Sequence, residues 1–305
     1  MFPVVLIMSL LFAGIDRKLH ARMQRRIGPP ITQPINDFIK LLNKERIVPM
    51  TASSSIFTSV PVIAAASAIL AATIQLVDVF NGHSFVGDLI LILYLLAMSS
   101  ILVMIGGSSS GNPYGAIGFS RKMTLLIGYE VPILISVVSL SLKSGFSLAY
   151  YDIIMAQTRI GTCFAFSTIS ASIAAIAYLL CVPAGTGILP FDIPEAKTEV
   201  AHGPLIEYGG PYLALMMLTK DVNSFALTFL GLTLFFYLPA LLGPFVLEGW
   251  MKLGLCLIGA LAIMVFVMTI PRTIFARFKL GPAFKFLLVP WILSTASLAL
   301  SLIGM

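Results

Sequence analysis

The chain has 305 residues, of which 58% are hydrophobic and only 10% are charged, and its formal net charge is +6. Soluble domains carry about 25% charged residues, so this composition excludes an ordinary soluble protein and indicates an integral membrane protein. We attribute the basic excess to loops that orient a membrane protein, and we expect the lipid bilayer and no nucleic acid as a partner.

Eight apolar segments, each near the length of about 20 residues that a spanning helix needs, follow one another along the chain. The first is short, so it either continues as a helix through Asp16 and Arg17 or begins upstream of the printed sequence. We therefore predict an all-α integral membrane protein in which residues 1–305 form one polytopic domain. The eight predicted spans are 1–15, 56–77, 86–108, 123–142, 162–182, 211–237, 252–270 and 283–303.

Basic residues are distributed unevenly between the loops. Of the 19 Lys and Arg residues, 15 lie in or directly beside the odd-numbered loops, and only three lie near the even-numbered ones. The positive-inside rule then predicts that the odd-numbered loops face the cytoplasm, and that both termini lie outside the cell membrane. The predicted cytoplasmic loops are 16–55, 109–122, 183–210 and 271–282.

Three loops have sequence features that predict their local structure. Residues 33–44 begin with a proline-containing turn and alternate apolar and charged positions at helical spacing, which predicts a short amphipathic helix on the membrane surface or on another loop. The stretch 106–115 is rich in Gly and Ser but lacks a phosphate-loop pattern, so we predict a flexible turn. Residues 78–88 form the second loop, in which Asn81-Gly82 indicates a turn.

The fifth loop and two spans contain an unusual set of ionisable residues. A charge at the bilayer centre costs about 2.5–3.5 kcal/mol or more, so such groups normally face a protein interior or water. For the carboxylates we favour a proton or cation relay. For the adjacent Lys220 and Asp221 in the sixth span, a structural pair with each other or with Glu130 remains an equal alternative. The candidate ion-translocation residues are Glu130, Asp192, Glu195, Glu199, Glu207, Lys220 and Asp221.

Neither a catalytic set nor a metal site is evident in the sequence. The three cysteines lie in apolar segments without metal-ligand spacing, and the three histidines form no pair at helical ligand spacing. We therefore expect no catalytic residues and no metal ligands in this chain.

Four motifs, in order along nearly the whole chain, resemble one family. It is the eight-span membrane subunit that complex I (NADH:quinone oxidoreductase) shares with energy-converting membrane-bound hydrogenases. The motifs are Arg26-Ile27-Gly28-Pro29-Pro30 with Gln33-Pro34 after it, Tyr129-Glu130-Val131-Pro132, Phe191-Asp192-Ile193-Pro194-Glu195-Ala196 with Glu207-Tyr208-Gly209-Gly210, and Pro271-Arg272 with Arg277.

The resemblance implies roles for these residues. It implies that Glu130, Glu195, Glu199 and Glu207, and more weakly Asp192, begin a charged path that couples redox chemistry to H⁺ or Na⁺ translocation. It also implies that the basic and polar loop residues hold a peripheral redox arm. The implied docking residues are Arg22, Arg25, Arg26, Gln33, Asp37, Lys40, Arg121, Arg272 and Arg277.

Departures from the quinone-reducing pattern indicate the hydrogenase or sulfur-reductase branch. The segment 28–34 is compressed, residues 203–206 stand where the quinone branch has an aromatic or His-Thr stretch, and Lys220 stands where that branch tends to have a glutamate. Lys122 departs from the hydrogenase-type pattern instead, since those relatives often have an acid there. The implied partners are hydrogenase-like peripheral subunits with Fe–S clusters, with a NiFe centre in the case of a hydrogenase-type complex, together with antiporter-like and small membrane subunits. The resemblance implies no cofactor in this subunit and leaves quinone binding open.

Other functions stay open at this point. The first alternative is the quinone-binding subunit of a true NADH:quinone oxidoreductase. The second is a stand-alone secondary ion transporter, which would be expected to contain internal repeats that we do not find. A membrane enzyme of lipid metabolism is third, and it is disfavoured because no metal-diphosphate motif is present.

Overall fold

The computed structural model describes residues 1–242 and 249–304, and every regular element in these ranges is a helix. The predicted all-α fold is therefore confirmed. The elements are α1 (Phe2–Met23), α2 (Gln33–Leu42), α3 (Ser54–Asn81), α4 (Asp88–Ser108), α5 (Pro113–Lys143), α6 (Tyr150–Ile160), α7 (Phe164–Ser167), α8 (Ile169–Thr186), α9 (Lys197–Val200), the 3-10 turn η1 (Gly203–Leu205), α10 (Gly210–Phe235), η2 (Leu238–Leu242), α11 (Gly249–Met264), the π-helix η3 (Val265–Thr269), α12 (Ile270–Ile274) and α13 (Leu280–Ile303).

Seven helical segments of the described chain are long and apolar enough to cross a membrane. They correspond to the second through eighth predicted spans, while α1 is not among them, so the count of eight is not established. The sequence Asp16-Arg17-Lys18 within α1 explains this, because it places three charges in the second half of the helix. Of the two alternatives given for this segment, the structure bears out the continuation of the helix through Asp16 and Arg17, since α1 ends at Met23.

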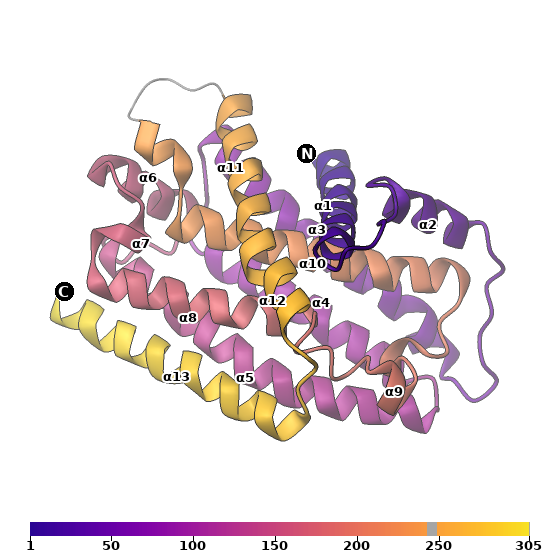
Figure 1. Ribbon diagram of the computed structural model, residues 1–305. Helices are drawn as coiled ribbons and strands as arrows, with labels where there is room; N and C mark the ends of the chain where they lie inside the picture. The colour runs from indigo at the N-terminus through magenta and orange to yellow at the C-terminus, as the bar shows by residue number, and fades with distance from the viewer. Residues whose placement is uncertain (243–248, 305) are drawn as a thin grey trace.

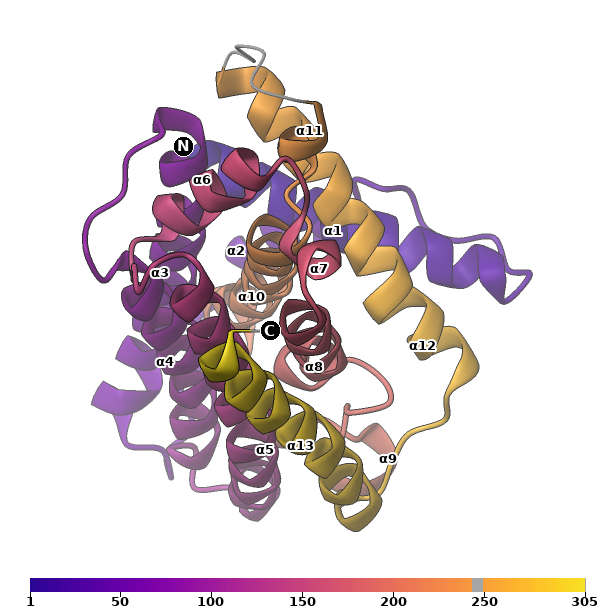
Figure 2. The same ribbon diagram turned by 90° about the vertical axis from the view of Figure 1, so that its left-hand side faces the viewer.

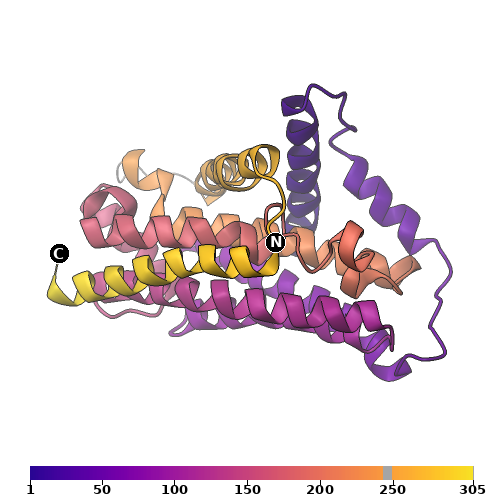
Figure 3. The same cartoon turned by 60° about the horizontal axis from the view of Figure 1, so that its bottom comes forward.

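Six long helices (α3, α4, α5, α8, α10 and α13) lie side by side in one bundle (Figures 1 and 2). In the most apolar part of the segment Gly210–Ala240, which contains α10, 83% of the residues are buried. The corresponding share for α13 is 22%, so α10 is central and α13 is peripheral. Alanines along α3, including Ala64, Ala68 and Ala72, are fully buried and allow close approach of its neighbours α4 and α10. Helices α1 and α11 cross this bundle on one side, and α1 stands steeply across it in Figure 3.

Several predicted boundaries differ from the structure for local reasons. The predicted loop 109–122 is largely helical, because the Asn112 side chain caps α5 by accepting from the Tyr114 amide at 2.9 Å and Pro113 occupies the first turn. The predicted loop 78–88 is shorter than expected, because α3 continues to Asn81 and α4 already begins at Asp88. The predicted turn at Asn81-Gly82 is present, with Gly82 in the left-handed region at φ +72°.

Two further elements bear on the functional site. The predicted amphipathic helix at 33–44 is confirmed as α2, which packs against α1 and α10. The seventh span contains the five-residue π-helix Val265–Thr269 between α11 and α12. Such π-turns are uncommon and occur frequently at functional sites.

Candidate functional site

The acidic loop, residues 187–209 between α8 and α10, folds onto the ends of α4 and α5. Gly107 of α4 and Gly118 of α5 both face Pro204 of this loop, and a Cβ added to Gly118 would lie 2.6 Å from the Pro204 Cδ. These glycines therefore permit the close approach of the loop. Gly107 belongs to the stretch predicted as a flexible turn, but it lies in the last turn of α4, where it supports the acidic loop.

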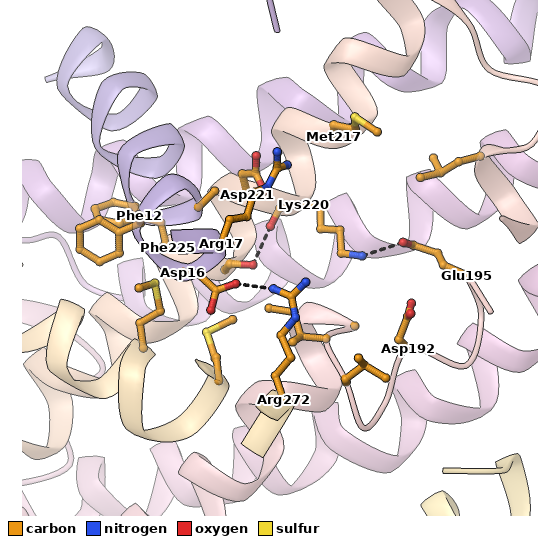
Figure 4. A pocket seen from close by; sticks show the side chains of 18 of the residues that line it. Phe12, Asp16, Arg17, Asp192, Glu195, Met217, Lys220, Asp221, Phe225 and Arg272 are labelled. Carbon is orange, nitrogen blue, oxygen red and sulfur yellow. Dashed lines mark hydrogen bonds and ion pairs between the residues drawn. The ribbon is translucent and has the colours of Figure 1, made fainter. Parts of the chain in front are cut away.

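The loop closes one side of a cavity of about 350 Å³, which we call the charged cavity (Figure 4). Its walls come from α1, the acidic loop, α10, the end of α11, the π-helix and α12. Phe12, Phe225, Met264 and Met268 form an apolar part of the wall. Its ionisable lining residues are Asp16, Arg17, Asp192, Glu195, His202, Lys220, Asp221 and Arg272.

Ion pairs order the charged cavity. The Lys220 Nζ lies 2.6 Å from a Glu195 carboxylate oxygen, and the Arg272 guanidinium lies 2.5 Å from Asp16 (Figure 4). Asp16 also accepts a hydrogen bond of 2.7 Å from the Thr269 hydroxyl at the end of the π-helix. The pair of Lys220 and Glu195 joins α10 to the acidic loop, and the pair of Arg272 and Asp16 joins α12 to α1. Rearranging either pair would therefore move the cavity walls.

Lys220 pairs with Glu195, and this is neither of the structural partners considered from sequence, Asp221 and Glu130. The reason is topological, because the acidic loop folds back over α10 and brings Glu195 to the lysine. Asp221 lines the same cavity, and so does Arg17 of α1.

Two carboxyl groups of the acidic loop, three residues apart, are shifted in opposite directions. Burial raises the pKa of Asp192 above its ordinary value, and the charges of Lys220 and Arg277, whose guanidinium lies 2.8 Å away, offset this only in part. Burial also acts to raise the pKa of Glu195, but the nearby charges of Lys220 and Lys122 outweigh it and lower that pKa. The nearby charges thus favour the ionised form of Glu195, whereas burial favours the protonated form of Asp192.

Small cavities continue from the charged cavity toward Glu130. One of about 20 Å³ is lined by Glu195, Lys220, Ser100 and Asn223, among others. The next, of about 10 Å³, is again lined by Ser100 and Asn223 and also by Glu130. Each volume is close to the space that one water molecule needs, and both sites have polar side chains in their walls. Shared lining residues thus link Glu195 to Glu130 by way of Asn223 and Ser100, and we call these four residues the polar line.

The remaining predicted carboxylates lie away from this line. Glu199 of α9 pairs with Arg121 at 2.5 Å, and its side chain is 44% exposed. Glu207 accepts a hydrogen bond of 2.6 Å from the Asn112 side chain, outside the walls of the charged cavity. The structure thus separates the predicted acidic cluster into two half-buried members that line the charged cavity, Asp192 and Glu195, and two outlying members.

The predicted docking residues also divide into two groups. Arg22, Arg25, Arg26 and Lys40 are exposed. The others make internal contacts: Asp37 with Gln33 at 2.8 Å and with Arg17 at 3.2 Å, and Arg121, Arg272 and Arg277 with the carboxylates named above.

Sequence reasoning missed several residues of the site, namely Asp16, Arg17, Asn223 and His202. The interruption of the first apolar segment by Asp16-Arg17 was a usable signal, but their partners lie far away in the sequence. His202 gave no signal, although the structure holds it and Ala201 in the left-handed region, at φ +81° and +46°. Such strain in residues other than glycine is frequent at functional sites.

No group of three or more His, Cys, Asp or Glu side chains within residues 1–242 and 249–304 is placed to hold a metal ion.

Comparisons with known proteins agree with the fold of a multi-pass membrane protein. A family model described as NADH dehydrogenase matches residues 1–303. The chain is 35% identical to the NADH-quinone oxidoreductase H subunit of Thermomicrobium roseum, over 77% of this chain and 74% of that protein. It is 33% identical to hydrogenase-4 component C of Escherichia coli, over 70% of this chain and 66% of that protein.

A solved structure is also similar. The chain superposes on a chain of the membrane-bound sulfane sulfur reductase, an archaeal respiratory membrane complex, with a TM-score of 0.86, 30% identity and coverage of 98% of this chain and 96% of that one. The chain belongs to the NADH dehydrogenase family of membrane subunits. The resemblance inferred from the four motifs, including the similarity to hydrogenase and sulfur-reductase relatives, is thereby confirmed.

Proposed function

We propose that the chain is the membrane-anchoring and energy-coupling subunit, without an active site of its own, of a complex-I-like respiratory complex. The family supports the first part, since relatives are a quinone oxidoreductase subunit, a hydrogenase component and a chain of a sulfur reductase complex. Its partners are peripheral subunits with Fe–S clusters, with a [NiFe] centre in a hydrogenase-type complex, and antiporter-like and small membrane subunits. The peripheral module docks on the exposed Arg22, Arg25, Arg26 and Lys40.

The observation that carries the coupling role is the polar line from the charged cavity to Glu130. An H⁺ or Na⁺ that enters the cavity alters the balance of charges around Glu195 and Lys220, which form an ion pair in its wall. Asn223 and Ser100 line both small cavities between this pair and Glu130. Because an uncompensated charge within the bilayer is costly, Glu130 responds strongly to the charge at Glu195. In the proposed topology the acidic loop faces the cytoplasm.

Purification of the intact complex from native membranes tests the subunit role. The proposal expects Fe–S proteins to co-purify with the chain in constant ratio. Isolation of the chain alone in an ion-transporting form would instead establish a stand-alone transporter. Arg26→Ala should release the peripheral module more readily on a native gel, with Arg159→Ala in α6 as the control.

Variants test the path separately from assembly. Glu130→Gln should reduce ion translocation by the reconstituted complex while the complex remains assembled. Glu199→Gln tests the outlying carboxylate, which should matter less if only the buried line conducts. Normal translocation by Glu130→Gln would remove that residue from the path.

Quinone binding is a second candidate because of the size of the charged cavity. Its volume of about 350 Å³ lies within the range of ligand pockets, about 300–1,000 Å³, and Phe12, Phe225, Met264 and Met268 give it an apolar wall. The many charges in the same walls favour ions over an uncharged ring. A photoreactive quinone analogue would label residues of α1 or α10 if quinone binds there, and labelling should be competed by quinone.

A further inference from the structure

A second pair of buried acids lies at the other end of the bundle from the acidic loop. Tyr208, at the end of that loop, stacks on Phe57 near the start of α3, with ring centroids 4.2 Å apart. Asp78 lies near the opposite end of the same helix, roughly 30 Å further along at about 1.5 Å per residue. Asp88, the first residue of α4, meets it there. We call Asp78 and Asp88 the distal acid pair.

The two carboxyl groups of the distal acid pair lie next to one another. Asp78 is 6% exposed and Asp88 is fully buried. Asp88 also accepts a hydrogen bond of 2.7 Å from the backbone N–H of Tyr150, which brings the start of α6 onto the pair. A carboxylate has only acceptor atoms, so two adjacent carboxyl groups can form a hydrogen bond to one another only when one of them carries a proton.

Basic side chains do not balance this pair. The ion pairs of the described residues include neither Asp78 nor Asp88. The ionisable side chain of α6 that faces the site is Tyr150, and it is not a cation. Two buried carboxylates without a counter-charge would be strongly unfavourable, so one bound proton is the simplest way to neutralise half of the charge.

Unsatisfied polar atoms surround the same place. One oxygen of each carboxyl group is buried without a hydrogen-bond partner, and so are both polar atoms of the Gln75 side chain. Gln75 is fully buried and lies three residues before Asp78 on the same face of α3. A neutral amide with a free donor and a free acceptor beside an acid pair suits a site whose charge changes, because it can serve either protonation state.

We propose that Asp78 and Asp88 form a proton-binding site that holds one shared proton at the end of the bundle opposite the acidic loop. The proposal stands on these contacts alone and does not depend on the coupling path to Glu130. The shared proton ties the end of α3 to the start of α4, and through the Tyr150 amide to α6. Loss of the proton leaves two buried negative charges side by side, so it should loosen the junction of the three helices.

Asparagine variants test the shared proton, because the Asn amide supplies the N–H donor that the proton otherwise provides. The thermal midpoint of the purified complex should fall as the pH rises in the wild type, and this fall should be smaller in both Asp78→Asn and Asp88→Asn. Asp152→Asn in α6, an exposed acid at the same end, is the control and should keep the wild-type profile. Unchanged profiles in both pair variants would overturn the proposal.

Infrared spectroscopy covers the case in which the variants fail to assemble. Wild-type complex labelled with ¹³C at aspartate should show a protonated carboxyl band that persists above the ordinary pH range of aspartate. Absence of that band would overturn the proposal. Stabilisation of the wild type by Na⁺ at constant ionic strength, lost in the pair variants, would also overturn it by identifying a metal cation as the ligand.

Discussion

The two ends of the helix bundle handle buried carboxylates in different ways. At the acidic-loop end, Asp16, Asp192 and Glu195 each pair with a basic side chain at 2.5–2.8 Å. At the other end, Asp78 and Asp88 lie next to one another and have no basic partner in an ion pair among the described residues. Paired charges respond to a neighbouring charge by rearranging, whereas an acid pair responds by gaining or losing a proton. The acidic-loop end is therefore suited to electrostatic switching and the distal end to holding a proton.

The largest effect is expected from breaking the best-buried ion pair. Arg272→Met leaves Asp16, whose side chain is 9% exposed, without its counter-charge. Removing one partner of a buried pair typically costs about 3–5 kcal/mol, so the variant should lower the free energy of unfolding by about 3 kcal/mol. Denaturant unfolding of the purified protein measures this. The double variant with Asp16→Leu should recover most of the loss, and failure to recover would contradict the pairing.

Glu195 and Asp192, the two neighbouring acids of the loop, are expected to make the stability of the fold depend on pH in opposite directions. The lowered pKa of Glu195 means that its ion pair stabilises the fold above the ordinary glutamate range and is lost as the pH falls through the folded pKa. The raised pKa of Asp192 has the opposite consequence: it favours the fold below the ordinary aspartate range, and this contribution is lost as the pH rises through the folded pKa.

Thermal midpoints measured across the acid range test these signs. Glu195→Gln should remove a contribution that grows with pH, and should cost about 1–3 kcal/mol near neutral pH because Lys220 is left unpaired. Asp192→Asn should remove a contribution that declines with pH. Equal slopes for the two variants would show that their surroundings do not differ as described.

A small effect is expected at the surface of the same end. Arg121→Ala removes the partner of Glu199, whose side chain is 44% exposed. Exposed pairs contribute about 0–1 kcal/mol, so stability should change by less than about 1 kcal/mol. A larger loss in denaturant unfolding would mean that Glu199 belongs to the buried network after all.

Much of the fold and part of the site could be predicted from the sequence. Apolar length and loop charge located the helices, and the cost of burying charge identified Glu130, Glu195, Lys220 and Asp221, because these signals are local. The partner of each charge could not be predicted, because Asp16 and Arg272 are brought together only by the crossing of α1 and α12.

The distal acid pair was missed for a different reason. The turn signal at Asn81-Gly82 and the two aspartates together resemble an ordinary polar loop. Helix hydrogen bonding continues past Asp78 and starts at Asp88, so both side chains are drawn into the interior. Only the packing of α6 against this end of the bundle, through Tyr150, shows that the acids are buried.

The number of ions moved per electron pair tests the coupling account most directly. The complex is reconstituted into sealed vesicles, and electron transfer and ion movement are recorded together for wild type, Glu130→Gln and the control Glu45→Gln in the first loop. The account predicts that Glu130→Gln lowers the ratio while the complex stays assembled, and that Glu45→Gln leaves it unchanged. A wild-type ratio in Glu130→Gln, with electron transfer intact, would contradict the account.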